Sequence, residues 1–172
     1  MTIRRGTFAT LHELFVLKLC SLYDIEQELI PALAEMAKAT GDKKVRELFS
    51  AHMEETKEQR DRLEKALESI GAPVSSAKVE AIRGMIKDAQ WLIKHAKTKE
   101  SLDAGLIAAA LYIEHYETAG YRAALSWAAL MQHERAVRLL GDTLAEEEAA
   151  AAKLEAAGKE ASARAFAAKL RE

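Results

Sequence analysis

Four long stretches of this chain repeat apolar residues every three or four positions, the period of a helix that buries one face. They span about residues 10 to 39, 43 to 70, 102 to 130 and 134 to 157, and a shorter helical stretch covers 78 to 97. The 172 residues include only 8 glycines and 2 prolines, and 6% are aromatic. The sequence therefore predicts long helices that pack closely through leucine, isoleucine and alanine.

Local signals predict where these helices begin and end. Thr10 and Glu13 have the spacing of a capping box. Gly41 suits a C-cap and Asp42 an N-cap, so a tight turn is expected between the first two long helices. Gly158 is expected to end the last long helix, ahead of a short basic tail helix.

The lengths of the connections predict the topology. The first two long helices are joined tightly, and so are the last two, whereas the segment between the pairs can carry the chain back along the bundle. This arrangement is the single long crossover of ferritin-like folds. We expect one all-α, ferritin-like domain over residues 1–172, with an antiparallel four-helix bundle in about 8–158 and a tail helix in 159–172. A five-helix up-down array, with 74–99 in the core, is the alternative.

Charge and hydropathy exclude several classes of partner. The formal net charge is −2, with both signs interspersed, so no face is predicted for nucleic acid or anionic lipid. Uncharged runs such as residues 104 to 113 are far short of the about 20 residues that a membrane span needs. The first six residues lack the apolar stretch of a signal peptide, and Cys20 is the single cysteine. We expect a cytoplasmic protein without nucleic-acid or membrane partners.

Acidic residues interrupt the apolar stripe near the middle of each long helix. One such glutamate is usually a boundary residue whose carboxylate reaches water. Acids near the middle of all four helices are not explained in this way, because antiparallel helices of similar length place them in one layer of the bundle. Spacings of i, i+3 also put paired members on one helix face. The predicted layer contains five carboxylates and one imidazole: Glu26, His52, Glu55, Glu114, Glu117 and Glu147.

Such a layer requires cations. Burying one ionised carboxylate costs several kcal/mol, and five in contact would repel one another or take up protons. No lysine or arginine occupies the same stripes. Two divalent ions would convert the repulsion into coordination, and oxygen-rich sites with imidazole suit iron or manganese. We predict two metal ions, iron first and manganese as the alternative.

Four motifs at these positions resemble the YciE/YciF family of bacterial stress-associated proteins. They are YDIEQEL at 23–29, HMEET at 52–56, EHYE at 114–117 and TLAEE at 143–147. The resemblance covers about residues 8 to 158, and it implies a rubrerythrin-like dimetal bundle that forms a homodimer. It also implies the ligand set, with His52 as the imidazole and these carboxylates: Glu26, Glu55, Glu114, Glu117 and Glu147.

The chain departs from the family pattern at two places. Ala151 stands where family members typically carry an aspartate, so one metal would hold water in place of a protein ligand, or Glu147 would be the only ligand of its helix. His52 precedes Glu55, the reverse of the usual ferritin-type order. The pairing of these two residues with each metal therefore stays open, with Glu54 or Glu58 as substitutes for Glu55.

Two functional hypotheses follow. The first is a di-iron oxidase or peroxidase that reacts with dioxygen or peroxide and takes electrons from a separate donor, because the rubredoxin-type cysteines of rubrerythrin are absent. The second is a structural or interaction protein that uses metal for stability, which Ala151 modestly favours. Tyr121 is expected to fill the core, with a hydrogen bond to a ligand as the alternative. His115 is expected to point away from the metals.

Overall fold

The structure is a computed structural model that describes residues 8–169, and within that range all regular secondary structure is helical. The helices are α1 (Leu11–Ala39), α2 (Lys43–Ser69), α3 (Glu80–His95), α4 (Lys99–Leu130) and α5 (Glu134–Lys169). Four are long, and α3 is the short helix that the sequence placed between the two pairs. The predicted boundaries at the first four helices hold to within a few residues.

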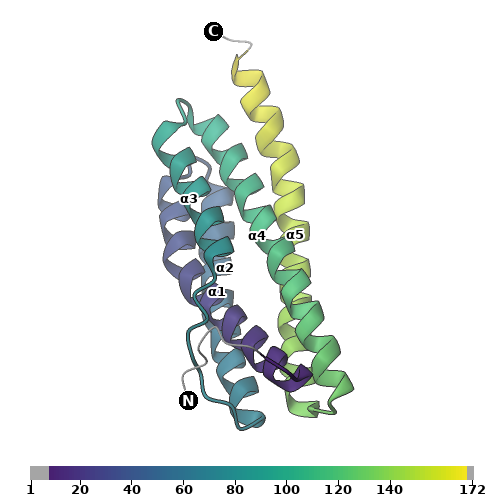
Figure 1. Cartoon of the computed structure of the whole chain (residues 1–172). Helices are drawn as coiled ribbons and strands as arrows, with labels where there is room; N and C mark the ends of the chain where they lie inside the picture. Colours follow the sequence, from purple (N-terminus) through teal and green to yellow (C-terminus); the bar gives the residue numbers. More distant parts are fainter. Residues whose placement is uncertain (1–7, 170–172) are drawn as a thin grey trace.

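The four long helices form an antiparallel bundle made of two hairpins. α1 packs against α2, α4 packs against α5, and the hairpins meet through contacts between α2 and α5 and between α1 and α4. Figure 1 shows the connection after α2 running back along the bundle into α3, which lies on the outside. This helix contacts α1 and α4 and buries just Ile82 and Ala89. The predicted crossover is confirmed, and the alternative with a fifth core helix is wrong.

Side-chain caps define the starts of the first two helices. The Thr10 hydroxyl accepts from the Glu13 N–H at 3.2 Å and the Glu13 carboxylate accepts from the Thr10 N–H at 3.1 Å, which completes the predicted capping box. Asp42 caps α2 by accepting from the Lys44 N–H at 2.7 Å. The C-cap of α1 is Thr40, not Gly41. Gly41 is needed for close approach, since a Cβ there would lie 2.7 Å from Cβ of Lys99.

The last helix corrects a prediction. α5 continues through Gly158 without a break, so no separate tail helix begins at residue 159. A helical glycine costs only about 1 kcal/mol relative to alanine, and the alanine-rich flanks favour continuation. Gly158 also lets α5 approach α4, because a Cβ there would lie 3.3 Å from Cγ2 of Ile107.

The core is built from the apolar stripes of the long helices, as expected. Phe15, Leu19, Leu63 and Leu106 are fully buried, and Cys20 is a small core residue beside them. The helices of the described range include none that is both long and apolar enough to cross a membrane. The buried face of each long helix therefore turns toward the bundle axis, which is where the acidic residues of the stripes are brought together.

A buried carboxylate on α4 holds the turn between α1 and α2. Asp103 accepts hydrogen bonds from the Gly41 N–H at 2.8 Å, the Asp42 N–H at 3.0 Å and the Thr40 hydroxyl. Replacing Asp103 with alanine should lower the free energy of unfolding by about 2 to 4 kcal/mol, because three donors lose a charged acceptor. Urea unfolding measures this effect.

The matched control is Asp88→Ala, at an exposed position of α3. Its effect should stay within about 0.5 kcal/mol. Equal stabilities of the two variants would contradict a role for Asp103 in holding the turn.

Candidate metal centre

Five of the predicted side chains lie buried together in the middle of the bundle. Each long helix contributes: α1 provides Glu26, α2 provides His52, α4 provides Glu114 and Glu117, and α5 provides Glu147. None of the five is more than 5% exposed. Five of the six members of the predicted layer therefore lie together in the structure, and the i, i+3 spacing of the two α4 glutamates places both on the buried face.

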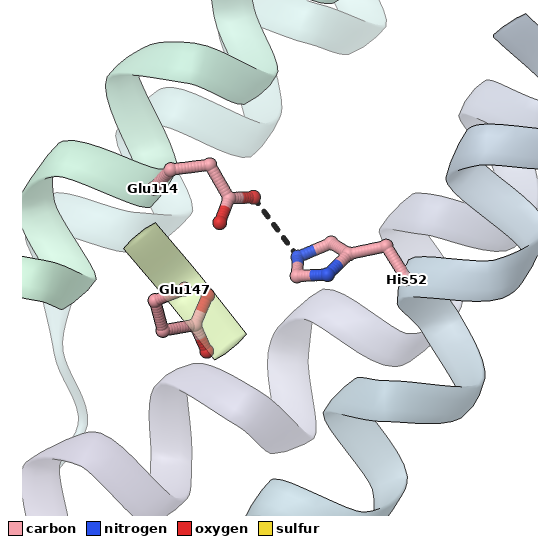
Figure 2. Close-up of side chains that lie close together, drawn as sticks. All are labelled: His52, Glu114 and Glu147. Atoms are coloured by element: carbon pink, nitrogen blue, oxygen red, sulfur yellow. Dashed lines mark ion pairs between the residues drawn. The ribbon is translucent and has the colours of Figure 1, made fainter. Parts of the chain in front are cut away.

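These side chains form two groups of possible metal ligands that share one residue. His52, Glu114 and Glu147 make one group, and Glu26, Glu117 and Glu147 make the other. In each group the donor atoms lie within 4.8 Å of one another. Figure 2 shows the first group, with His52 and Glu114 facing each other and Glu147 beside them. Glu147 lies where one carboxylate could contact two ions.

Most of the acidic oxygens in this cluster lack a hydrogen-bond partner. His52 Nε2 lies 2.9 Å from Oε1 of Glu114, and the Tyr121 hydroxyl donates to Oε1 of Glu26. Within residues 8–169, no hydrogen bond reaches the second oxygen of either acid or any carboxylate oxygen of Glu117 and Glu147. Buried polar atoms are normally satisfied. Six unpaired oxygens in one cluster are what oxygen-binding cations would satisfy, so the residues fit the predicted dimetal group.

Burial raises the pKa values of three of these acids. Burial raises the pKa of Glu117 and of Glu147 well above the ordinary value, and neighbouring carboxylates raise both further. Burial also raises the pKa of Glu26 to about 8, although the Tyr121 hydrogen bond and the charge of His52 work in the opposite direction. Without metal, the cluster therefore holds protons at neutral pH.

His52 carries a proton in the metal-free cluster as well. Burial disfavours the charged imidazolium, but the contacts with Glu114 and Glu55 outweigh this effect and raise the pKa of His52 to about 10. An imidazole binds metal only when a ring nitrogen is free of its proton. Metal binding here would therefore displace protons from both the carboxylates and the imidazole.

Glu55 lies at the edge of the cluster. Its side chain is 38% exposed, with Oε2 3.5 Å from Nδ1 of His52 and Oε1 3.8 Å from Nζ of Lys153. The buried face of α2 passes through His52, Thr56 and Gln59, which turns residue 55 toward the rim. The contact with His52 and the charge of Lys153 lower the pKa of Glu55 against the effect of burial. It belongs to neither group of possible ligands.

The substitutes for Glu55 lie farther out. Glu54 forms an exposed pair with Lys57 at 2.7 Å, and Glu58 lies 3.6 Å from Arg62 with its side chain 75% exposed. Neither carboxylate is in the buried cluster. Of the acids on α2, Glu55 is thus the one that contacts His52.

Three further positions match their expectations. Tyr121 is fully buried and realises both predicted roles, because it fills the core and bonds a candidate ligand. His115 is exposed. Ala151 is buried one turn beyond Glu147 and offers no donor atom there. The metal roles of the six predicted ligands stay a prediction.

A polar network beside the cluster was not predicted from the sequence. Nη2 of Arg62 lies 2.7 Å from Oε1 of Glu146, and Nε2 of Gln59 donates to the same carboxylate at 3.3 Å. The network joins α2 to α5 directly before Glu147 and so restrains that residue's backbone. Only the pairing of α2 with α5 reveals this network, because Arg62 lies beside the apolar stripe of α2 and its partner Glu146 is on another helix.

The four long helices and the helical crossover make this fold a ferritin-like bundle. The possible metal ligands that all four long helices bring to its centre make that centre a candidate dimetal site. The chain belongs to the family described as "Domain of unknown function (DUF892)", whose family model matches residues 10–167. The motif resemblance to YciE/YciF proteins agrees with this assignment.

Known relatives confirm both the family and the fold. Protein YciF of Escherichia coli K12 is 37% identical over 146 residues, which cover 84% of this chain and 88% of that protein. The crystal structure of the E. coli stress protein YciF matches with a TM-score of 0.87 and 35% identity, covering 90% of this chain and 98% of that one. YcfI of Rhodopseudomonas palustris, described as a candidate structural protein, matches with a TM-score of 0.85 and 32% identity, covering 89% and 98%.

Proposed function

We propose that this protein binds two divalent metal ions, iron first and manganese as the alternative, and reacts them with peroxide or dioxygen as part of a stress response. The observation that carries the proposal is the set of six unpaired, buried carboxylate oxygens in two groups that share Glu147. The description of E. coli YciF as a stress protein supports the physiological context.

Each group of side chains would hold one ion. His52 and Glu114 would bind the first, Glu26 and Glu117 the second, and Glu147 would lie between them. Iron bound here would supply the electrons that reduce the oxidant. The Tyr121 hydroxyl holds one oxygen of Glu26 and leaves the other free to bind. Burial excludes water from these ligands, which strengthens their electrostatic interactions with a cation.

Stoichiometric oxidation tests the proposal. Metal-free protein is loaded with two equivalents of Fe(II) without oxygen, and hydrogen peroxide is titrated while near-ultraviolet absorption is followed. One peroxide should oxidise each pair of ferrous ions, because reducing peroxide to water takes two electrons. The reaction should be faster than with the same Fe(II) in buffer. Oxidation no faster than free Fe(II), or absent, would contradict the catalytic part of the proposal.

A structural role for the metal is the second candidate. The missing donor at Ala151 favours it, and YcfI is described as a candidate structural protein. In that case chelation would lower the melting temperature while no oxidant is consumed. The peroxide titration therefore distinguishes the two candidates.

We also propose that the protein works in the cytoplasm as a homodimer and receives electrons from a separate donor. The family resemblance supports the dimer, and α4 exposes large apolar side chains at Tyr112 and Leu130 that a second copy could cover. Light scattering coupled to gel filtration should give twice the chain mass. A monomer at micromolar concentration would contradict the dimer.

A further inference from the structure

A small cavity lies between α2, α4 and α5, directly beside the imidazole of His52. Its volume is about 50 Å³. Three of its lining residues are alanines, namely Ala51, Ala110 and Ala150, whose small side chains leave the space open. Ala51 and Lys153 are exposed, so the cavity reaches the surface of the bundle.

The polar groups of this cavity form a line from solvent to the buried cluster. Lys153, whose side chain is 59% exposed, lies 3.8 Å from Glu55, and Glu55 lies 3.5 Å from Nδ1 of His52. Nε2 of the same ring lies 2.9 Å from Glu114. Side-chain exposure falls along this line from 59% to 38%, 7% and 1%. Nδ1 of His52 has no hydrogen bond from any residue of the described range, and both His52 and Glu55 help to line the cavity.

A divalent cation needs such a line of donors to reach a buried site. An ion that gives up its water before it meets a ligand carries a large desolvation cost. Glu55 is half-exposed, so it can bind the ion while water still surrounds it, and the next donor inward lies within 3.5 Å. The apolar walls formed by the alanines offer no competing ligand along the way.

We propose that this cavity is the route by which divalent metal ions reach the centre, with Glu55 as the carboxylate that transfers each ion to His52. Lys153 is a positioning residue: its ammonium group holds Glu55 at the mouth in the metal-free protein and competes with an arriving cation. The inference rests on the proposed metal centre and explains why Glu55 lies apart from both groups of buried ligands.

The test is the rate of Co(II) uptake, which needs no oxidant. Metal-free protein is mixed with Co(II) in a stopped-flow instrument, and the visible absorption of the bound ion is recorded. Ala51→Leu fills the mouth from an exposed position and should slow uptake by about 10-fold or more, while Co(II) bound at equilibrium stays at the wild-type amount. Ala149→Leu, at an exposed position outside the cavity, is the matched control and should bind at the wild-type rate.

A second variant is expected to change the rate of Co(II) uptake in the opposite direction. Lys153→Met keeps the length of the side chain but removes its charge, so uptake should become about 3-fold faster at low salt, with the difference shrinking as salt is added. Lys159→Met, on an exposed position of the same helix, controls for the change in net charge. A loosened fold could also speed uptake, but that acceleration would not shrink as salt is added, so the salt dependence identifies the effect of the Lys153 charge.

The outcomes separate this inference from the proposed function. If the wild-type protein binds no Co(II), the metal centre itself is wrong and the route falls with it. If the wild-type protein binds Co(II) but Ala51→Leu and Lys153→Met take it up at the wild-type rate, the route is wrong while the centre stands. A lower amount of bound Co(II) in Ala51→Leu at an unchanged rate would also overturn the route, because it would show altered ligands instead of slower access.

Discussion

Replacing Glu147 with glutamine is expected to abolish tight binding of both metal ions together. Glu147 belongs to both groups of possible ligands, and both of its oxygens lack a hydrogen bond in the part of the chain that the structure describes. A glutamine amide offers one neutral oxygen, so neither ion keeps a charged ligand at this position. Changes outside the ligand set typically cost 10- to 100-fold in metal affinity, and a shared ligand should cost about 100-fold or more.

Metal analysis after dialysis against a fixed concentration of free metal measures this loss. Glu148→Gln is the matched control, because the neighbouring carboxylate is half-exposed, pairs with Arg122 at 2.8 Å and lies outside the cluster. Glu117→Gln should weaken one ion far more than the other, since Glu117 belongs to one group only. Two tightly bound ions in Glu147→Gln would show that this residue does not bridge them.

The same substitution should stabilise the metal-free protein at alkaline pH. Burial and neighbouring carboxylates raise the pKa of Glu147, so its ionisation at high pH opposes folding. A glutamine cannot ionise and escapes this effect. A stabilised fold that has lost metal would show that Glu147 is retained for binding.

The stability of the metal-free protein should fall as pH rises from about 5 to 9, and bound metal should reverse the loss. The pKa of Glu26 is about 8 in the fold and about 4.3 in an unfolded chain, so the folded state holds the extra proton between these values. Its contribution is fully present below about pH 4.3 and is lost as pH approaches 8. His52 has a folded pKa of about 10 against about 6.5 unfolded, so its contribution is lost between these two values. Both residues therefore lower the stability of the folded state as pH rises.

The expected changes in stability with pH and with bound metal are large enough for thermal unfolding to measure. Each extra proton held by the folded state gives a slope of about 1.4 kcal/mol per pH unit. Metal at 100 times its dissociation constant adds about 2.7 kcal/mol, which corresponds to about 5 to 10 °C in a domain of this size. Melting temperatures with a chelator and with Mn(II), taken at several pH values, give both quantities.

The difference between the melting temperature with Mn(II) and that with a chelator should increase toward pH 8, because the ligands lose their protons there and bind metal more tightly. Glu13→Gln is a control outside the cluster, since Glu13 is an exposed residue of the α1 cap. Stability that does not change with pH, together with melting temperatures that a chelator leaves unchanged, would contradict a cluster of buried, metal-binding acids.

The sequence by itself determined the four long helices, the N-caps of the first two and five members of the buried cluster. Its apolar stripes have the helical period, so Glu26, His52, Glu114, Glu117 and Glu147 could be assigned to buried faces without knowing the neighbours. Matching heights followed from short connections within each hairpin. The capping residues were predictable because Thr10 and Asp42 act on backbone groups within three residues of their own positions.

Tertiary packing decided what lies at the edges of those stripes. The helical repeat of apolar residues does not say whether a residue at the edge of the buried face is covered by a neighbouring helix. Whether Glu55 is buried therefore depended on how α2 packs against α4 and α5. The same holds for Gly158, whose missing Cβ matters because Ile107 of α4 lies against it, and for Asp103, whose partners are about 60 residues away in the chain. Glu147 is shared between two groups of residues from different helices, and Lys153 contacts Glu55 across α5 and α2. Only the packing of these helices brings the side chains together.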